Sequence, residues 1–214
     1  PQKPQNYYDA INNTNQQGLD GSDYTDAINL LANRDEFRYN VITAPGLILD
    51  NASTGAGWTS IQSNCENRGD AIFVGDLSNY NSSITQVGST AASVDSSYVA
   101  TYWPWLMVSD PDSRQLVWVC ASTMIPGVYA YNDRAGEPWF APAGINRGGL
   151  GAVRQAERKL TNANRDTLYQ AKVNPIATFP GTGIVVFGQK TLQTKASALD
   201  RVNVRRLLIT LKNY

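Results

Sequence analysis

Histidine is absent from all 214 residues of the chain, and this absence excludes more chemistry than any other feature of the composition. Ser-His-Asp and Cys-His catalytic centres need an imidazole as the base, and most zinc sites use one as a ligand. We therefore predict that the protein is not an enzyme, and that it has no catalytic residues, no metal site and no bound cofactor.

Net charge is also lacking, because 18 lysine and arginine residues balance 18 aspartate and glutamate residues. A balanced chain has no overall attraction for nucleic acid or for an anionic membrane, so we expect neither as a partner. The sequence contains no apolar run long enough to span a bilayer, and no signal-peptide pattern. With 42% hydrophobic and 17% charged residues, the composition is that of a globular protein.

Cysteine is nearly absent, since Cys65 and Cys120 are the only two. Cys120 ends an apolar, strand-like run, whereas Cys65 lies at helical spacing in a separate segment. We predict two buried, reduced thiols, as in a reducing compartment, rather than a disulfide.

Helix and strand patterns alternate along most of the chain. Residues 1–21 are rich in Gln, Asn and Pro and are predicted to be a flexible lead-in, followed by one domain over residues 22–214. The expected fold is an α/β (α+β) sandwich, in which helices flank a mixed β-sheet and one β-hairpin is present. Expected helices include residues 22–34, a short helix that stops near Gly69, 122–136, 150–160, 165–172 and a last helix from about Val202. Asn174-Pro175 is expected to stop the helix at 165–172. Expected strands include 37–41, 71–74, 98–108, 116–120 and 184–187.

The stretch 137–149 holds two prolines and the aromatic pair Trp139 and Phe140, and it cannot form a regular helix or strand. Because large aromatics are costly to leave in water, we predict a packed crossover in which Trp139 is buried. Glycines in the stretch allow a close backbone approach or a phosphate cradle. The Gly-Lys-Ser/Thr ending of a phosphate loop is missing, so the structural role is favoured.

Two groups of residues suggest other functions. Trp103 and Trp105, with Trp139, could form a platform for a glycan, although aromatics in such a stretch more often belong to the core or edge of a sheet. Asp110 and Asp112 could form an acid-base pair, but two aspartates beside a proline are normally turn formers.

Charged residues at two further places could have either a binding role or a purely structural role. Asp70 and Asp76 bracket an apolar strand; they could bind a metal, but no third ligand is visible nearby, so turn or cap duty is favoured. The last helix has apolar residues at helical spacing and basic residues on its other side. The basic residues could meet an acidic partner, but a solvated helix face is the ordinary explanation. The apolar residues are Val204, Leu207, Leu208 and Leu211. The basic residues are Arg201, Arg205 and Lys212.

Several motifs resemble, in the same order, those of contractile phage tail sheath proteins, and the match is strong from Tyr98 to Leu211. The motifs span residues 137–149, 165–169, 173–176, 179–191 and 200–207.

The resemblance implies a structural subunit that polymerises helically around a tail tube and contracts to drive the tube through the host envelope. The implied partners are other sheath copies, the tail tube protein and the baseplate. The implied location is the tail of a myovirus virion, with a large-genome phage as the suggested source, after assembly in the host cytoplasm. Because family members continue into a C-terminal segment that reaches neighbouring subunits, we expect a core fragment that is monomeric by itself. The alternative function is an α/β module that binds a small ligand or a glycan.

Overall fold

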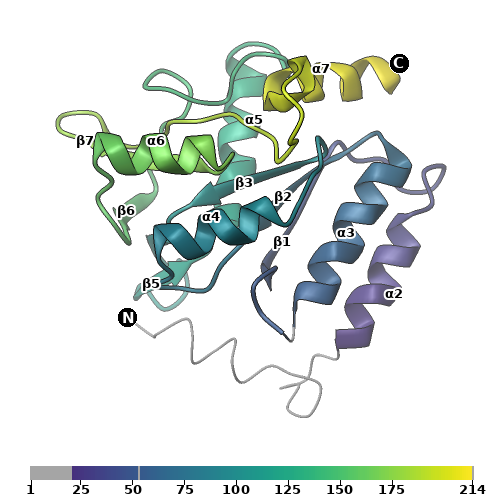
Figure 1. The fold of residues 1–214 in the computed structure, drawn as a ribbon, viewed down its shortest axis with the longest axis horizontal. Helices are drawn as coiled ribbons and strands as arrows, with labels where there is room; N and C mark the ends of the chain where they lie inside the picture. Colours follow the sequence, from purple (N-terminus) through teal and green to yellow (C-terminus); the bar gives the residue numbers. More distant parts are fainter. Residues whose placement is uncertain (1–20, 53, 214) are drawn as a thin grey trace.

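A five-stranded mixed β-sheet lies at the centre of the computed structural model, which describes residues 21–52 and 54–213 (Figure 1). The strand order is β1-β2-β3-β7-β8; the first four strands run parallel, and β8 returns antiparallel to β7. The strands are Val41–Ile48 (β1), Ile72–Asp76 (β2), Val99–Trp103 (β3), Asn174–Phe179 (β7) and Gly183–Val186 (β8).

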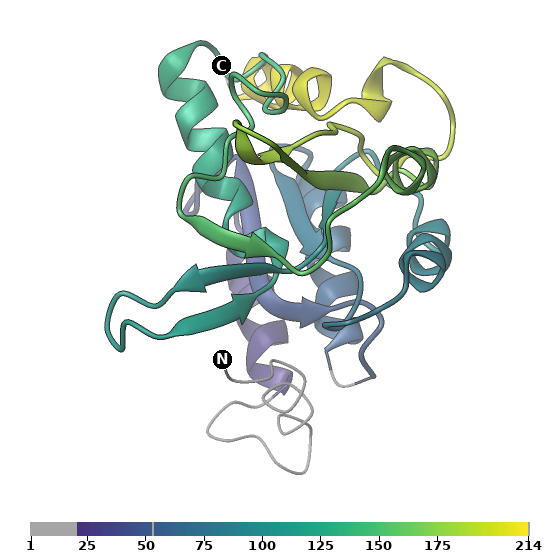
Figure 2. The ribbon, with the colours of Figure 1, turned by 90° about the vertical axis from the view of Figure 1, so that its left-hand side faces the viewer.

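A smaller antiparallel sheet has the order β5-β4-β6. Its strands are Leu106–Ser109 (β4), Leu116–Val119 (β5) and Val153–Ala156 (β6). The β4–β5 hairpin extends away from the body of the molecule (Figure 2). This hairpin confirms the predicted one, and β7–β8 forms a second hairpin that the sequence did not predict.

Helices cover both faces of the large sheet. One face packs against α2 (Gly21–Leu31), α3 (Gly55–Arg68), α4 (Ile84–Ala92) and α6 (Asn162–Gln170). The other packs against α5 (Ile125–Ala135), α7 (Val202–Lys212) and the small sheet. Within the described residues there are also two 3₁₀ turns, Ala121–Thr123 (η1) and Ala198–Asp200 (η2). The predicted α/β class is therefore confirmed.

Strand β2 shows why the sequence at 71–74 is a continuous apolar run. Phe73 points into the core beneath α3 and α4, whereas Ile72 and Val74 point into the core beneath α5 and α7. All five residues of β2 are buried. A strand covered on both faces is apolar over most of its length, so the predicted strand at 71–74 is confirmed.

The predicted helix at 150–160 is wrong, because this segment contains β6. Strand β6 pairs with β4, so that Leu106 lies opposite Ala156 and Val108 opposite Val153. Only Val153 and Ala156 are buried in β6. Cross-strand pairing with a distant segment, which local spacing cannot show, decides the structure here.

Strand β7 was also missed, because Asn174-Pro175 was interpreted as a helix stop. Proline has no backbone N–H to donate to a neighbouring strand, yet Pro175 lies opposite Trp103 of β3. The side-chain amide of Asn174 donates to the carbonyls of Thr101 at 3.0 Å and Lys190 at 2.7 Å. This side chain therefore supplies local hydrogen bonds that a proline-containing strand cannot make with its own backbone.

Strand β1 begins at Val41 and not at Phe37 as predicted. The guanidinium of Arg68 donates to the carbonyls of Leu31 at 2.6 Å and Phe37 at 2.9 Å, which fixes the segment before β1 as a loop. Helix α3 then ends as predicted at Gly69, whose positive φ of 66° suits glycine.

Both cysteines are buried and no disulfide joins them, which confirms the prediction of buried thiols. Burial raises the pKa of Cys65 to about 12. Residues 1–20 of the predicted lead-in lie outside the described residues, so the division at residue 21 stays a prediction. Across the described part of the chain, no helix combines the length and hydropathy needed to cross a bilayer.

Candidate assembly surface

The segment between α5 and β6 runs along the outer edge of β8 and is bound to it by its backbone. The amide of Gly144 donates to the carbonyl of Val186 at 2.8 Å, and the amide of Val186 donates to Gly148 at 2.8 Å. The amide of Leu150 donates to Ile184 at 2.9 Å. Residues 136–150, which we call the crossover, therefore cover the edge strand of the large sheet.

Glycine is required in the crossover for close approach and not for phosphate binding. A Cβ atom on Gly148 would lie 2.6 Å from the carbonyl oxygen of Val186, which is too close for any other residue. Gly144 has a φ of 85°, where glycine is favoured. The amides of both glycines already donate within the protein, so they do not form a free phosphate cradle.

The end of α5 fixes the aromatic part of the crossover. Asn132 is fully buried, and its side-chain amide donates to the carbonyls of Glu137 and Phe140, at 3.2 Å each. The amide of Phe140 donates to Glu137 at 2.9 Å and closes a turn. The ring of Phe140 lies over Gly136, where an added Cβ would collide with it.

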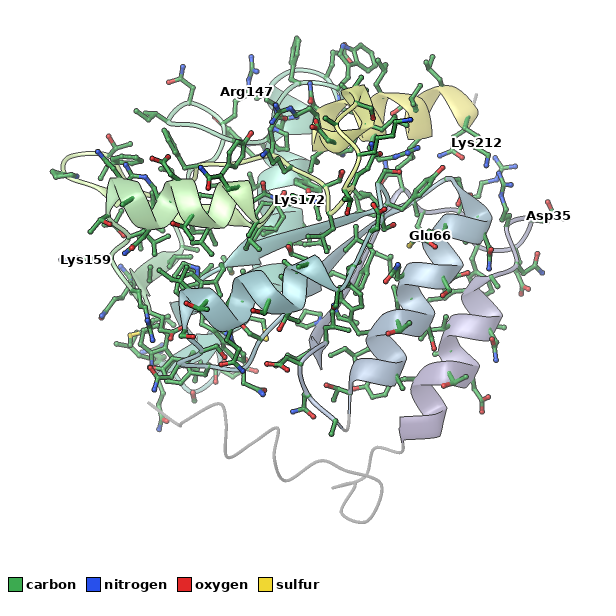
Figure 3. The ribbon with its side chains drawn as sticks, in the orientation of Figure 1. Asp35, Glu66, Arg147, Lys159, Lys172 and Lys212 are labelled. Atoms are coloured by element: carbon green, nitrogen blue, oxygen red, sulfur yellow. The ribbon has the colours of Figure 1, made fainter. Side chains whose placement is uncertain are left out.

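The prediction that Trp139 is buried is wrong. Trp139 and Phe140 are each 38% exposed, and Ile145 is 59% exposed. Asn132 takes the interior position beneath the turn, so the two aromatic side chains are left at the surface. The guanidinium of Arg147 lies 4.6 Å from the centre of the Phe140 ring and covers only part of it. Figure 3 shows Arg147 at the α7 end of the molecule.

Helix α7 lies beside the crossover and α5. The side-chain amide of Asn203 donates to the carbonyl of Trp139 at 3.3 Å. Arg206 forms a two-pronged ion pair with Asp133 of α5, at 2.8 and 2.5 Å. The rigid crossover thus presents its aromatic residues next to α7.

The interpretation of Arg205 as part of a solvated basic stripe is wrong. Arg205 is 6% exposed; it donates to the backbone and hydroxyl oxygens of Ser97 and lies 3.9 Å from the centre of the Tyr98 ring. Lys212 is exposed, but its ammonium donates to the carbonyl of Arg68 at 2.9 Å. Two of the three basic side chains therefore bind to the protein's own backbone.

The three tryptophans considered for glycan binding are not brought together on one surface. Trp103 and Trp105 are only 3% and 2% exposed. The indole of Trp105 donates to the carbonyl of Ser78 at 3.0 Å. These two side chains belong to the core, and only Trp139 reaches the surface.

Asp110 and Asp112 occupy the tip of the β4–β5 hairpin, as expected of turn formers. The carboxylate of Asp110 accepts the hydroxyl of Ser113 at 2.5 Å and the amide of Asp112 at 3.1 Å. These hydrogen bonds, with that of Ser113 the largest cause, lower the pKa of Asp110. A low pKa favours the ionised form, which does not suit a general acid at neutral pH.

Asp70 and Asp76 are buried and bonded within the fold. Asp70 pairs with Arg68 at 2.9 Å and with Arg34 at 3.3 Å. Asp76 accepts the hydroxyl of Ser122 at 2.5 Å and its amide at 3.1 Å. Burial raises the pKa of Asp76 to about 6, against the opposing effect of these hydrogen bonds. Ser122 therefore anchors η1 to β2 and does not cap α5, which starts three residues later.

No group of three or more potential metal-ligating side chains occurs within residues 21–52 and 54–213. The described features are structural: buried charges that join elements, and exposed apolar residues on the crossover and α7. An exposed apolar patch on a rigid frame is typical of a protein-protein contact.

A family model described as the phage tail sheath protein central domain matches residues 17–192 of the chain. The chain belongs to this family. The tail sheath protein of Vibrio phage KVP40 is 40% identical over 126 residues, which are 59% of this chain and 18% of that protein. The tail sheath protein of Enterobacteria phage T4 is 35% identical over 126 residues, which are again 59% of this chain and 18% of that protein.

Solved structures of contractile systems share the fold. A chain in the baseplate of the anti-feeding prophage has a TM-score of 0.65 at 23% identity, covering 91% of this chain and 49% of that one. The contracted helical sheath of the same system has a TM-score of 0.60 at 24% identity, covering 86% and 48%. The present chain thus spans about half of each of these two chains, and its aligned part is about a fifth of the curated sheath relatives.

Proposed function

We propose that the chain forms the core of a structural, non-enzymatic subunit of a contractile phage tail sheath. In this function the subunit polymerises helically around the tail tube and contracts to drive the tube through the host envelope. Membership of the sheath family supports the proposal, as do structural matches to a helical sheath and a baseplate. The site of action would be the tail of the virion.

The proposed partners are other copies of the subunit, the tail tube protein and the baseplate, with no nucleic acid and no inserted membrane segment. The balanced charge of the chain fits the absence of a nucleic-acid partner. Contraction requires contacts that differ between two assembled states, because only such differences can shift an equilibrium. That residues 1–214 alone are monomeric stays a prediction.

The observation that carries the assembly proposal is the crossover. Its backbone is bound to β8, α5 and α7, yet Trp139, Phe140 and Ile145 face solvent. A rigid frame loses little conformational entropy on association, and exposed aromatics contribute much of the binding energy at protein interfaces. We therefore assign the crossover to a contact between neighbouring copies.

Electron microscopy of the full-length protein tests this function. The unaltered protein should form tubes of uniform width, and Trp139→Ala should shorten or abolish them. Because Trp139 is 38% exposed, the variant should lose about 2 kcal/mol of unfolding free energy as a monomer, below the roughly 3–5 kcal/mol typical of a fully buried tryptophan. Leu30→Ala, at an exposed apolar position on α2, is the matched control and should leave the tubes intact.

The outcomes separate two parts of the proposal. If the unaltered protein forms no tubes under any assembly condition, the sheath function is contradicted. If Trp139→Ala forms normal tubes, the function stands and the crossover is not the contact.

A further inference from the structure

Helix α7 carries an apolar face that points away from the protein. Leu208 is 41% exposed and Leu211 is 61% exposed. Val204 and Leu207 are half-buried, yet neither packs into the three hydrophobic clusters of the described residues. These four residues, which we call the leucine face, recur at i, i+3, i+4 and i+7, the spacing of one helix face.

The opposite face of α7 prevents the helix from turning its leucines inward. Val202 and Ile209 are buried in the core beside β2 and β3. Arg205 is held by Ser97, and Arg206 is 3% exposed and held by Asp133. Rolling the helix would break both sets of bonds and move two arginines, so the leucine face is fixed outward.

We propose that, in the full-length sheath protein, an amphipathic helix of the same polypeptide, from outside residues 1–214, covers the leucine face. The proposal rests on family membership and not on polymerisation. Four apolar residues at helical spacing form the ridge that a second helix packs against. A partner within the same polypeptide also has a far higher effective concentration than a second molecule.

The length of the relatives supports a partner within the same polypeptide. The 126 residues that match the Vibrio phage KVP40 protein are only 18% of it, so most of a sheath protein lies outside the matched region. In the anti-feeding prophage structures the matched chain is about twice the length that this fold covers. Sheath proteins therefore contain ample additional chain to cover a single helix face.

Cysteine labelling of the full-length protein tests the proposal. The variant Leu208→Cys reports on the leucine face, and Ser89→Cys, at an exposed position of α4, is the matched control. Within residues 1–214 the native cysteines give little background in the folded protein, because Cys65 is 0% and Cys120 1% exposed. Labelling of the unaltered full-length protein is subtracted under both folded and denaturing conditions. Maleimide labelling rates are measured on unassembled protein, whose state is checked by light scattering. They are normalised to the rates in denaturing urea.

We expect the thiol introduced by Leu208→Cys to react at least about tenfold more slowly than that of Ser89→Cys in the unassembled protein. Equal normalised rates would show that the leucine face is bare and would overturn the proposal. Protection that appears only after tubes form would assign the face to a second copy and would equally overturn it. If no tubes form at all, the comparison in unassembled protein still decides this inference independently of the sheath function.

Discussion

The two faces of α7 show the reverse of an ordinary amphipathic helix. The inner face contains Arg205 and Arg206, which are 6% and 3% exposed, beside the apolar Val202 and Ile209. The outer face contains the leucines. Burying a charge is costly unless it is paired and hydrogen-bonded. Arg206 meets that condition through Asp133, whereas Arg205 is hydrogen-bonded to Ser97 and lies over the ring of Tyr98.

The two faces show that charge alone does not decide whether a side chain is exposed. A charged side chain can be buried where the fold supplies hydrogen-bond or ion-pair partners. Arg206 is also 4.7 Å from the ring of Tyr129, whose hydroxyl lies 2.7 Å from that of Tyr102. These contacts join α7 to α5 and to β3. Leu208 and Leu211 have no such compensation within residues 21–52 and 54–213, and the proposed covering helix would supply it.

The largest expected effect is a difference in unfolding free energy between substitutions at two adjacent residues of α7. Ile209→Ala removes a side chain that is 2% exposed and should cost about 2–4 kcal/mol of unfolding free energy. Leu208→Ala, one residue earlier, should cost less than about 1 kcal/mol in residues 1–214, because Leu208 is 41% exposed. Urea denaturation measures both. Equal losses would contradict the assignment of inner and outer faces.

Breaking the ion pair between α7 and α5 should have the next largest effect. Arg206→Ala leaves Asp133 without its partner, but the Asp133 side chain is 31% exposed and water can solvate part of it. We therefore expect a loss of about 2–3 kcal/mol, below the range for a fully buried pair.

The salt dependence of this loss is informative, because buried pairs are screened less than surface pairs. The loss should persist in about 1 M NaCl, where exposed charges are strongly screened. Arg134→Ala, at an exposed position of α5, is the control and should change stability by less than about 0.5 kcal/mol. A loss for Arg206→Ala that vanishes in high salt would place the pair at the surface.

A buried carboxylate that is not paired with a cation should respond to pH. The pKa of Asp76 is about 6 in the folded protein, above its ordinary value of 3.8. The folded state therefore binds more protons between these values. The stability from this group is fully present below about pH 4 and is lost as pH rises through about 6.

From about pH 4 to pH 7, the unaltered protein should lose about 2–3 kcal/mol relative to Asp76→Asn, whose stability does not depend on the ionisation of this carboxyl group. Urea denaturation across the pH range measures the difference. Asp110→Asn should show a slope of opposite sign, because the pKa of Asp110 is lowered. A flat difference for Asp76→Asn would show that the carboxyl is solvated.

Local sequence patterns correctly predicted the elements whose conformation does not depend on contacts with distant segments. The buried strand at 71–74, the end of α3 at Gly69 and the start of the last helix at Val202 all follow from apolar runs, glycine and helical spacing. The turn at Asp110 follows from its proline and aspartates. The order of motifs also indicated the sheath family, which the family model confirms.

Long-range contacts decided what local patterns could not. Strand β6 exists because β4 lies beside it, and β7 exists because the Asn174 side chain supplies hydrogen bonds across the proline. In the candidate surface, the crossover was predicted as a rigid segment, but the exposure of Trp139 depends on Asn132 occupying the interior.

By itself, the amino-acid sequence determined the α/β class, the absence of imidazole chemistry, the balanced charge and the helical spacing of α7. Spacing places residues on one side of a helix but does not say which side meets the core. For α7, the tertiary structure decided this: Ser97 and Asp133 provide bonds for the arginines, so the arginines turn inward and the leucines turn outward.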